Sequence, residues 1–141
     1  MRSMNSKPAQ HVLINLSAVE PAPVKASEGW RDMDIRFLID RARTGSGSVC
    51  LFRALFAPGA AHEAHLHPNA DEVYFVIRGN PVVGYGSQER TIEPGTADFV
   101  PAGAVHWLRN PVGSEPVEVV GCYLGVGSLA EAGYVPAPKA P

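Results

Sequence analysis

Short stretches of apolar residues, spaced two apart, run through most of the chain. In residues 30–39 these positions are Met33, Ile35, Phe37 and Ile39, a period that is typical of a strand with one buried face. Residues 48–57 are almost continuously apolar, which is typical of a strand buried on both faces. Gly, Pro, Asn and Asp residues between the stretches favour turns. The pattern predicts an all-β fold with strands at 11–19, 30–39, 48–57, 72–77, 81–85, 88–92, 105–110 and 117–126.

The segments between these strands are short and predict tight connections. Residues 41–48 contain two glycines and are expected to join the two strands of a hairpin. Pro58 and Gly59 predict a turn after the apolar strand. Ser128, with Glu131 three residues later, forms a capping-box pattern that predicts one helical turn. Residues 135–141, VPAPKAP, predict a Pro-rich disordered end.

Histidines and one glutamate fall where neighbouring strands would bring them together. His65 and His67 are two apart, so both imidazoles leave the same face of a strand. Residues 68–71 are turn formers that would reverse the chain, and Glu72 then begins a strand that returns beside the two imidazoles. His106, on the strand predicted at 105–110, is the candidate fourth ligand. A single histidine in a strand is more often an ordinary polar residue than a ligand, and the prediction therefore depends on all four positions together.

Three imidazoles and a carboxylate, with no thiolate, suit a divalent transition metal. This donor set accepts Mn²⁺, Fe²⁺, Co²⁺, Ni²⁺, Cu²⁺ or Zn²⁺ and argues against a Cys-type zinc site. A divalent ion with one carboxylate ligand leaves a formal charge of plus one. We therefore expect an anionic or enolisable oxygen ligand, such as a carboxylate, enediol or catecholate, as the substrate group.

Two segments resemble the motifs of the cupin superfamily at every defining position. The first, GAAHEAHLHPNADEVYFVIRG, covers Gly59 to Gly79, and the second, GTADFVPAGAVHWLRN, covers Gly95 to Asn110. The resemblance implies an antiparallel jelly-roll barrel, or double-stranded β-helix, at residues 48–126. Residues 1–47 would contribute strands that pack on the barrel or on a dimer partner, and residues 127–141 a helical turn and a tail. One metal ion, with iron or manganese favoured, would be held by His65, His67, Glu72 and His106.

The resemblance leaves the reaction open among three classes. The first expectation is a dioxygenase-like oxidoreductase that acts on an enolisable, phenolic or carboxylate substrate. The second is a non-redox isomerase, lyase, decarboxylase or polyketide cyclase, and the third is a ligand-binding or sensing protein. Tyr74, which shares a strand face with Glu72, could hydrogen-bond a bound oxygen. His62 could shuttle protons, because an unperturbed histidine titrates near neutral pH. A non-redox reaction needs a general base near the metal, for which His62, Tyr74 and Tyr85 are the available groups.

Other side chains have both a structural and a functional interpretation. Arg53 interrupts an apolar strand and is either ion-paired or an anion hook for the pocket. The aromatic residues Phe52, Phe56 and Trp107 belong either to the core or to a wall of an organic-substrate pocket. Cys50 and Cys122 lie in apolar runs and are expected to be small buried hydrophobes without a disulfide.

Composition narrows the class of protein and its partners. The 141 residues are 45% hydrophobic and carry a formal charge of −2, which fits one domain with its own core. This charge gives no electrostatic footprint for nucleic acid or an anionic membrane. The apolar stretch from Val12 is too short for a signal peptide or a membrane span. We therefore expect a cytoplasmic protein with a small-molecule substrate. A homodimer could form through the strand predicted at 11–19.

Overall fold

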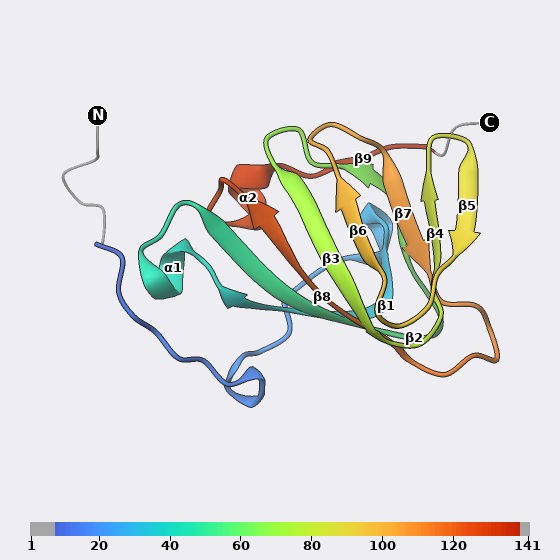
Figure 1. Ribbon diagram of the computed structural model, residues 1–141, viewed down its shortest axis with the longest axis horizontal. Helices are drawn as coiled ribbons and strands as arrows, with labels where there is room; N and C mark the ends of the chain where they lie inside the picture. Colours follow the sequence, from blue (N-terminus) through green and yellow to red (C-terminus); the bar gives the residue numbers. More distant parts are fainter. Residues whose placement is uncertain (1–7, 139–141) are drawn as a thin grey trace.

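The computed structural model describes residues 8–138, which form an antiparallel β-barrel with two short helices, α1 (Arg41–Thr44) and α2 (Leu129–Ala132) (Figure 1). The strands pair in the order β5-β4-β7-β2-β8-β3-β6, and both β1 and β9 pair with β2. Their bounds are β1 Trp30–Ile39, β2 Val49–Leu66, β3 Asp71–Arg78, β4 Val82–Tyr85, β5 Gln88–Thr91, β6 Ala97–Val100, β7 His106–Arg109, β8 Val117–Leu124 and β9 Val135–Pro136. The all-β jelly-roll barrel predicted from the sequence is confirmed.

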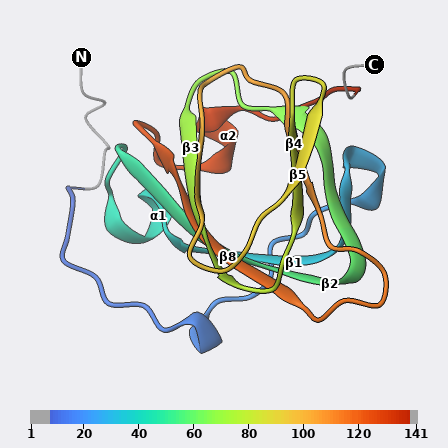
Figure 2. The same cartoon turned by 45° about the vertical axis from the view of Figure 1, so that its right-hand side comes forward.

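Strand β2 belongs to both walls of the barrel. Its first half, to Phe56, pairs with β8, and its second half, from Ala61, pairs with β7. The backbone N–H of Gly59 donates to the carbonyl of Asn110 at 2.9 Å, and Gly59 has a φ of 85°, a left-handed conformation that favours glycine. The strand therefore bends at the predicted turn but does not end there. Figure 2 shows β3 and β8 on one side of the barrel and β4 and β5 on the other.

Asn110 stabilises this bend from inside the protein. Its buried side-chain amide donates to the carbonyl of Phe56 at 3.1 Å and to the carbonyl of Glu115 at 2.9 Å. These bonds join the end of the first half of β2 to the loop between β7 and β8. Buried backbone carbonyls need such partners, so Asn110, the last residue of the second motif, has a structural role at the corner.

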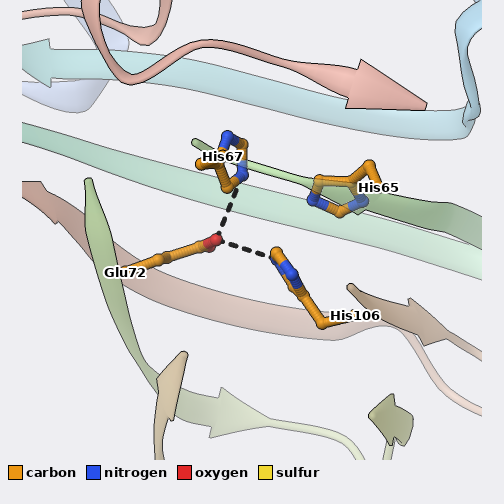
Figure 3. A group of neighbouring side chains, drawn as sticks. All are labelled: His65, His67, Glu72 and His106. Carbon is orange, nitrogen blue, oxygen red and sulfur yellow. Dashed lines mark hydrogen bonds and ion pairs between the residues drawn. The ribbon is translucent and has the colours of Figure 1, made fainter. Parts of the chain in front are cut away.

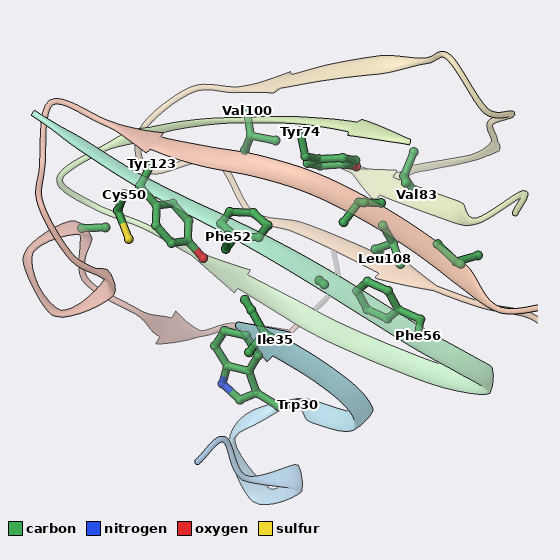
Figure 4. Packing of buried hydrophobic residues seen from close by; sticks show 14 of the residues in the cluster. Trp30, Ile35, Cys50, Phe52, Phe56, Tyr74, Val83, Val100, Leu108 and Tyr123 are labelled. Atoms are coloured by element: carbon green, nitrogen blue, oxygen red, sulfur yellow. The ribbon is translucent and has the colours of Figure 1, made fainter. Parts of the chain in front are cut away.

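Inward-facing apolar side chains fill the space between the two walls (Figure 4). Phe52 on β2 packs against Tyr123 on β8 with ring centroids 5.2 Å apart. A Cβ atom at Gly121 would lie 2.6 Å from the Phe52 ring, so this close packing requires glycine. Each fully buried large apolar side chain contributes about 1.5–3 kcal/mol. The barrel interior is thus a packed core, and the histidine and glutamate side chains are placed within it.

The N-terminal segment differs from the prediction. Residues 8–29 contain two 3-10 turns, η1 (Leu16–Ala18) and η2 (Ala26–Glu28), and the strand predicted at 11–19 is absent from them. The side chain of Asn15 accepts the N–H of Ser17 at 2.9 Å, a local bond that turns the chain and competes with strand pairing. The prediction of a strand at 11–19 was therefore wrong. Strand β1, by contrast, has the predicted range and pairs along β2.

Helix α1 and strand β9 were not predicted, whereas the helical turn α2 was. The segment after β1 includes helix α1, because the side chain of Asp40 accepts the N–H of Arg43 and caps the turn. Ser128 caps α2 in the same way, as predicted. Val135 and Pro136, expected to be disordered, form β9 and pair with β2 at Leu66 and His65, while residues 139–141 of the predicted tail lie outside the described part. Within residues 8–138, neither helix has the length or hydropathy that crossing a membrane requires.

Candidate metal centre

Four side chains predicted as ligands converge inside the barrel (Figure 3). His65 lies near the end of β2, His67 follows this strand directly, Glu72 lies on β3 and His106 begins β7. One nitrogen or oxygen of each residue lies within 4.8 Å of those of the others, and all four residues are buried. The structure therefore brings together every residue of the predicted donor set.

Cross-strand pairing explains this convergence. His65 and His106 are direct partners across the β2–β7 ladder, so their side chains share a face. Glu72, Tyr74 and Val76 are all buried and point inward from β3, as the alternation predicted. The turn at residues 68–70 reverses the chain between His67 and Glu72, as expected.

The three imidazoles are held by backbone carbonyls that define their tautomers. A carbonyl oxygen can only accept, so the ring nitrogen facing it must carry the proton. In each ring this nitrogen is Nδ1, which leaves Nε2 free to face the centre of the cluster. Such outer contacts are the usual way in which proteins orient metal-binding histidines. Nδ1 donates to the carbonyl oxygen of Glu63 in His65 (2.6 Å), of Gly133 in His67 (2.7 Å) and of Ala104 in His106 (2.9 Å).

Two of the inward nitrogens lack a hydrogen bond. His65 Nε2 and His67 Nε2 are buried and have no hydrogen-bond partner among residues 8–138. Leaving a buried polar atom unsatisfied costs about 1–3 kcal/mol. A cation near the Glu72 carboxylate would accept both lone pairs and remove this cost. The donor atoms and their orientation therefore fit a bound divalent metal.

Electrostatics keep the carboxylate charged. Burial raises the pKa of Glu72, but the hydrogen bond from His106 and the nearby His67 ring outweigh it and lower the pKa to about 2. Glu72 Oε1 lies 3.0 Å from His106 Nε2 and 3.3 Å from His67 Nε2. Burial lowers the pKa of His106, but the hydrogen bond and charge of Glu72 raise it overall. Without metal, the Glu72 carboxylate thus favours a proton on His106, and a divalent cation would replace that proton.

His65 is stabilised in its neutral form. Burial, helped by the charge of His106, lowers the pKa of His65 to about 3. A metal ion binds the neutral imidazole. His65 is therefore ready to coordinate throughout the physiological pH range.

His62 stacks directly on His65. Its ring centroid is 3.7 Å from that of His65 and 3.9 Å from that of Trp30. The strand pairing is irregular between His62 and His65, so residues three apart come to the same side, contrary to the parity expected of a regular strand. Burial lowers the pKa of His62 well below its ordinary value. His62 therefore contacts the predicted metal site as a neutral ring.

A hydrogen-bonded chain fixes the His62 tautomer. Tyr134 donates its hydroxyl proton to the carbonyl of Glu28 at 2.5 Å, and the same hydroxyl lies 3.2 Å from His62 Nε2. Since the single Tyr134 proton is used, His62 Nε2 must donate to this oxygen. The unprotonated nitrogen of His62 is then Nδ1.

Tyr74 lies beside the cluster, but its hydroxyl is already bonded. It donates to Asp98 Oδ2 at 2.5 Å, and burial, with Asp98, raises the Tyr74 pKa far above its usual range. Tyr74 is therefore a proton donor in a fixed hydrogen bond. Asp98 was not identified from the sequence. Its register opposite Tyr74 places it on the inward face of β6, so a strand assignment at residues 97–100 would have revealed a charged side chain facing inward.

Other predicted residues lie away from the cluster. Arg53 Nε bonds Glu118 at 2.8 Å, which supports the structural interpretation of this arginine. Trp107 packs over Gly84, where an added Cβ would lie 1.7 Å from the indole, and donates to Glu89 at 2.7 Å. Trp107 is buried and lines neither cavity described below, which supports its interpretation as a structural residue.

Two cavities meet at His106. A groove of about 1070 Å³ is lined by residues of β4, β5 and β6, among them Tyr85, and by His106. A smaller cavity of about 30 Å³ contacts His62, His65, Glu72, Tyr74 and His106 and is otherwise mainly apolar, with Phe52 and Phe56 in its wall. The larger groove has space for an organic molecule, and the smaller cavity has space for a molecule the size of water. His106, one of the four candidate metal ligands, contacts both.

Three contributors to the site gave no usable sequence signal. Trp30 and Tyr134 reach His62 from opposite ends of the chain, and the carbonyl of Gly133 orients His67. No spacing relates these positions to the histidines, because their contacts depend on how the terminal segments fold over the barrel.

Fold and cluster together define the class: a jelly-roll barrel with three histidines and one glutamate in its interior. Residues 52–123 match the Cupin domain family. The match covers half of the chain, and the protein therefore belongs to the cupin family.

Similar proteins come from several functional groups. Germin-like protein subfamily 2 member 2 of Arabidopsis thaliana is 32% identical over 103 residues, 67% of this chain and 47% of the relative. The chain spans about half the length of such curated relatives. The polyketide cyclase RemF from Streptomyces resistomycificus superposes with a TM-score of 0.75 at 17% identity, over 91% of this chain and 86% of that one. A recombinant oxalate oxidase in complex with glycolate has a TM-score of 0.64 at 25% identity, over 75% of this chain and 55% of that one.

Proposed function

We propose that the protein is a metal-dependent enzyme that acts on a small organic molecule. His65, His67, Glu72 and His106 would hold one divalent ion. Imidazole and carboxylate donors without thiolate accept several divalent transition metals, among which this proposal favours iron or manganese. The observation that carries this proposal is the pair of buried, unpartnered Nε2 atoms beside a charged carboxylate. When bound, the ion would supply Lewis acidity and open positions for oxygen ligands.

An oxidoreductase is the reaction class that the cavities support best. The groove beside His106 can admit an organic substrate, and the small apolar cavity has space for a molecule the size of O₂ or water. Phe52, Phe56 and Leu108 would exclude bulk water from this cavity. Tyr74 and Asp98 would present a fixed hydrogen-bonded pair to the interior. This arrangement supports the proposal of a dioxygenase-like reaction on an enolisable, phenolic or carboxylate substrate.

Metal content and oxygen uptake test the proposal. Protein purified anaerobically should contain close to one iron or manganese per chain and should consume O₂ with an active member of a panel of enols, catechols and 2-oxo acids. Chelator-treated protein should lose the uptake, and returning the metal should restore it. Bound zinc or nickel without O₂ uptake would overturn the oxidoreductase assignment.

A non-redox reaction is the second candidate, and His62 favours it. The ring is neutral, and its Nδ1 is the nitrogen left to accept a proton. An isomerase, lyase, decarboxylase or cyclase needs such a base beside the bound substrate. The same panel separates the two candidates, since a non-redox enzyme would convert substrate anaerobically.

We also propose a homodimer through the outer face of β3 and β6, which lie side by side in Figure 1. Phe75, Ile77 and Phe99 are 45%, 47% and 60% exposed on these strands. Neighbouring exposed apolar residues favour association. Light scattering should give twice the mass of one chain for the wild type and one chain mass for Phe75→Lys/Ile77→Lys. Val112→Lys, at an exposed loop residue, should remain dimeric. A monomeric wild type would contradict the dimer.

A reducing compartment such as the cytoplasm suits the two cysteines. Cys50 is buried, Cys122 is half-buried, and both are free thiols. Cys122 pairs across the ladder with Leu51, so neighbouring Cys50 and Cys122 face opposite sides of the sheet. No disulfide is needed to hold these strands together.

A further inference from the structure

The groove beside the candidate metal centre lies between the two end strands of the sheet. The strand order begins with β5 and ends with β6, so no ladder joins these two strands. Thr91 on β5, Asp98 on β6 and His106 at the start of β7 all line the groove. It therefore leads from the open side of the barrel to one of the four converging side chains.

Arg90 points into this groove. Its cross-strand partner is Val83, which is buried in the core, and directly opposed residues share a face of an antiparallel ladder. Both residues line the groove. By contrast, the neighbouring pair, Gly84 and Glu89, faces the other side, where Glu89 accepts from Trp107.

The Arg90 guanidinium lacks an acidic partner within residues 8–138. Two carboxylates also line the groove: Asp98, which accepts the Tyr74 hydroxyl, and Glu93, and neither forms an ion pair with Arg90. Six other arginines bond to acidic residues, namely Arg31, Arg36, Arg41, Arg43, Arg53 and Arg109. A planar guanidinium matches a carboxylate in geometry and charge. Arg90 is therefore available to a ligand anion.

The remaining lining is suited to a ring system. Tyr85 is an exposed aromatic residue at the groove, and Val83 and Val100 are apolar and buried. Tyr85 is the cross-strand partner of His106, so its ring lies next to the inner end. The volume of about 1070 Å³ lies just above the range of about 300–1,000 Å³ typical of sites for drug-sized ligands. A two-carbon acid would leave most of this space unfilled.

We propose that the groove binds an aromatic or polycyclic acid, with its carboxylate at Arg90 and a hydroxyl or enol oxygen directed toward His106. This substrate class rests on the proposed function, because the second oxygen needs the metal ion at the inner end. Tyr85 contacts the ring system. Arg90 then selects substrates by charge and sets their orientation relative to the metal centre.

Binding of 6-hydroxy-2-naphthoate to zinc-loaded protein tests this assignment without oxygen chemistry. The probe carries a phenolic oxygen and a carboxylate at opposite ends of a two-ring system, and 2-naphthol lacks only the carboxylate. Arg90→Gln should raise the Kd of the naphthoate about tenfold, since hydrogen bonds to charged groups are the stronger ones, and should leave the Kd of 2-naphthol unchanged. Arg78→Gln is the matched control, because Arg78 lies on β3 outside the groove lining.

The outcomes separate this inference from the proposed function. Tighter binding of oxalate than of the naphthoate, or an Arg90→Gln variant with unchanged affinity, would overturn the groove assignment. A protein that binds no zinc would refute the metal-dependent function, whereas Arg90-dependent binding of the naphthoate to the same protein would still support the groove. Zinc titration and probe titration on one preparation therefore give independent answers.

Discussion

Glu72→Gln should lower the affinity for a divalent metal by more than about 100-fold. Loss of a residue that merely orients a ligand costs about 10–100-fold in metal affinity, and Glu72 is itself a donor and the only anionic one in the cluster. The amide preserves the size of the side chain but removes the charge that offsets a divalent ion. Competition with a chromogenic chelator would measure the change.

The control for this variant is Glu115→Gln, at an exposed position in the loop before β8. It makes the same chemical change outside the cluster and should leave metal affinity at the wild-type value. Circular dichroism should show the same β-structure for both variants, which excludes unfolding as the cause. Metal binding by Glu72→Gln that equals the wild type would refute the four-ligand model.

The donor set could be predicted because it depends on short-range geometry. The pair His65 and His67 needs only the two-residue period of a strand, and Glu72 needs only a turn between two strands. Placing His106 beside them required the resemblance to a known family, since no local pattern relates the two motifs. The jelly-roll barrel was predicted in the same way, whereas the individual strands followed from alternation.

The remaining contacts depend on irregularities and on contacts distant in sequence. One irregular ladder step between His62 and His65 places both rings in one stack, which regular alternation excludes. A single Asn15 side-chain bond interrupts the N-terminal segment, which otherwise alternates like a strand. Tyr134 reaches His62 across 72 positions of the chain. Such features follow from the packed structure and have no fixed offset in the sequence.

Metal-free protein should be most stable near pH 6.5 and lose stability as the pH falls from 6.5 toward 4.5. Burial lowers the pKa of His65 to about 3, and that of His62 well below its ordinary value of 6.5. Between pH 6.5 and 4.5 the unfolded chain binds one proton at His62 and one at His65, whereas the folded chain keeps both rings neutral. Each of these protons lowers the free energy of unfolding by about 1.4 kcal/mol per pH unit as the pH falls, and the two together lower it by about 2.7 kcal/mol per unit.

Glu72 and His106 affect the two ends of this profile. The pKa of Glu72 is lowered to about 2, so its contribution is present above pH 4.5 and is lost as the pH falls toward 2. The pKa of His106 is raised, so its contribution is complete below pH 6.5 and is lost as the pH rises through the folded value. Stability therefore falls on the acid side because of His62, His65 and Glu72, and on the alkaline side because of His106. The maximum lies between these two losses, at or just below neutrality.

Urea unfolding of chelator-treated protein across pH 4.5–8 would measure this profile, and His62→Phe would separate the two histidines. Phenylalanine keeps a ring between Trp30 and His65 but cannot bind a proton. The slope below pH 6.5 should then fall by half, to about 1.4 kcal/mol per pH unit. Equal slopes in variant and wild type would show that His62 does not remain neutral in the folded protein, and a flat wild-type profile would contradict the lowered pKa of both rings. Saturating metal should raise the curve because it binds only the folded state, and the increase should diminish at low pH because protons compete for the same Nε2 atoms.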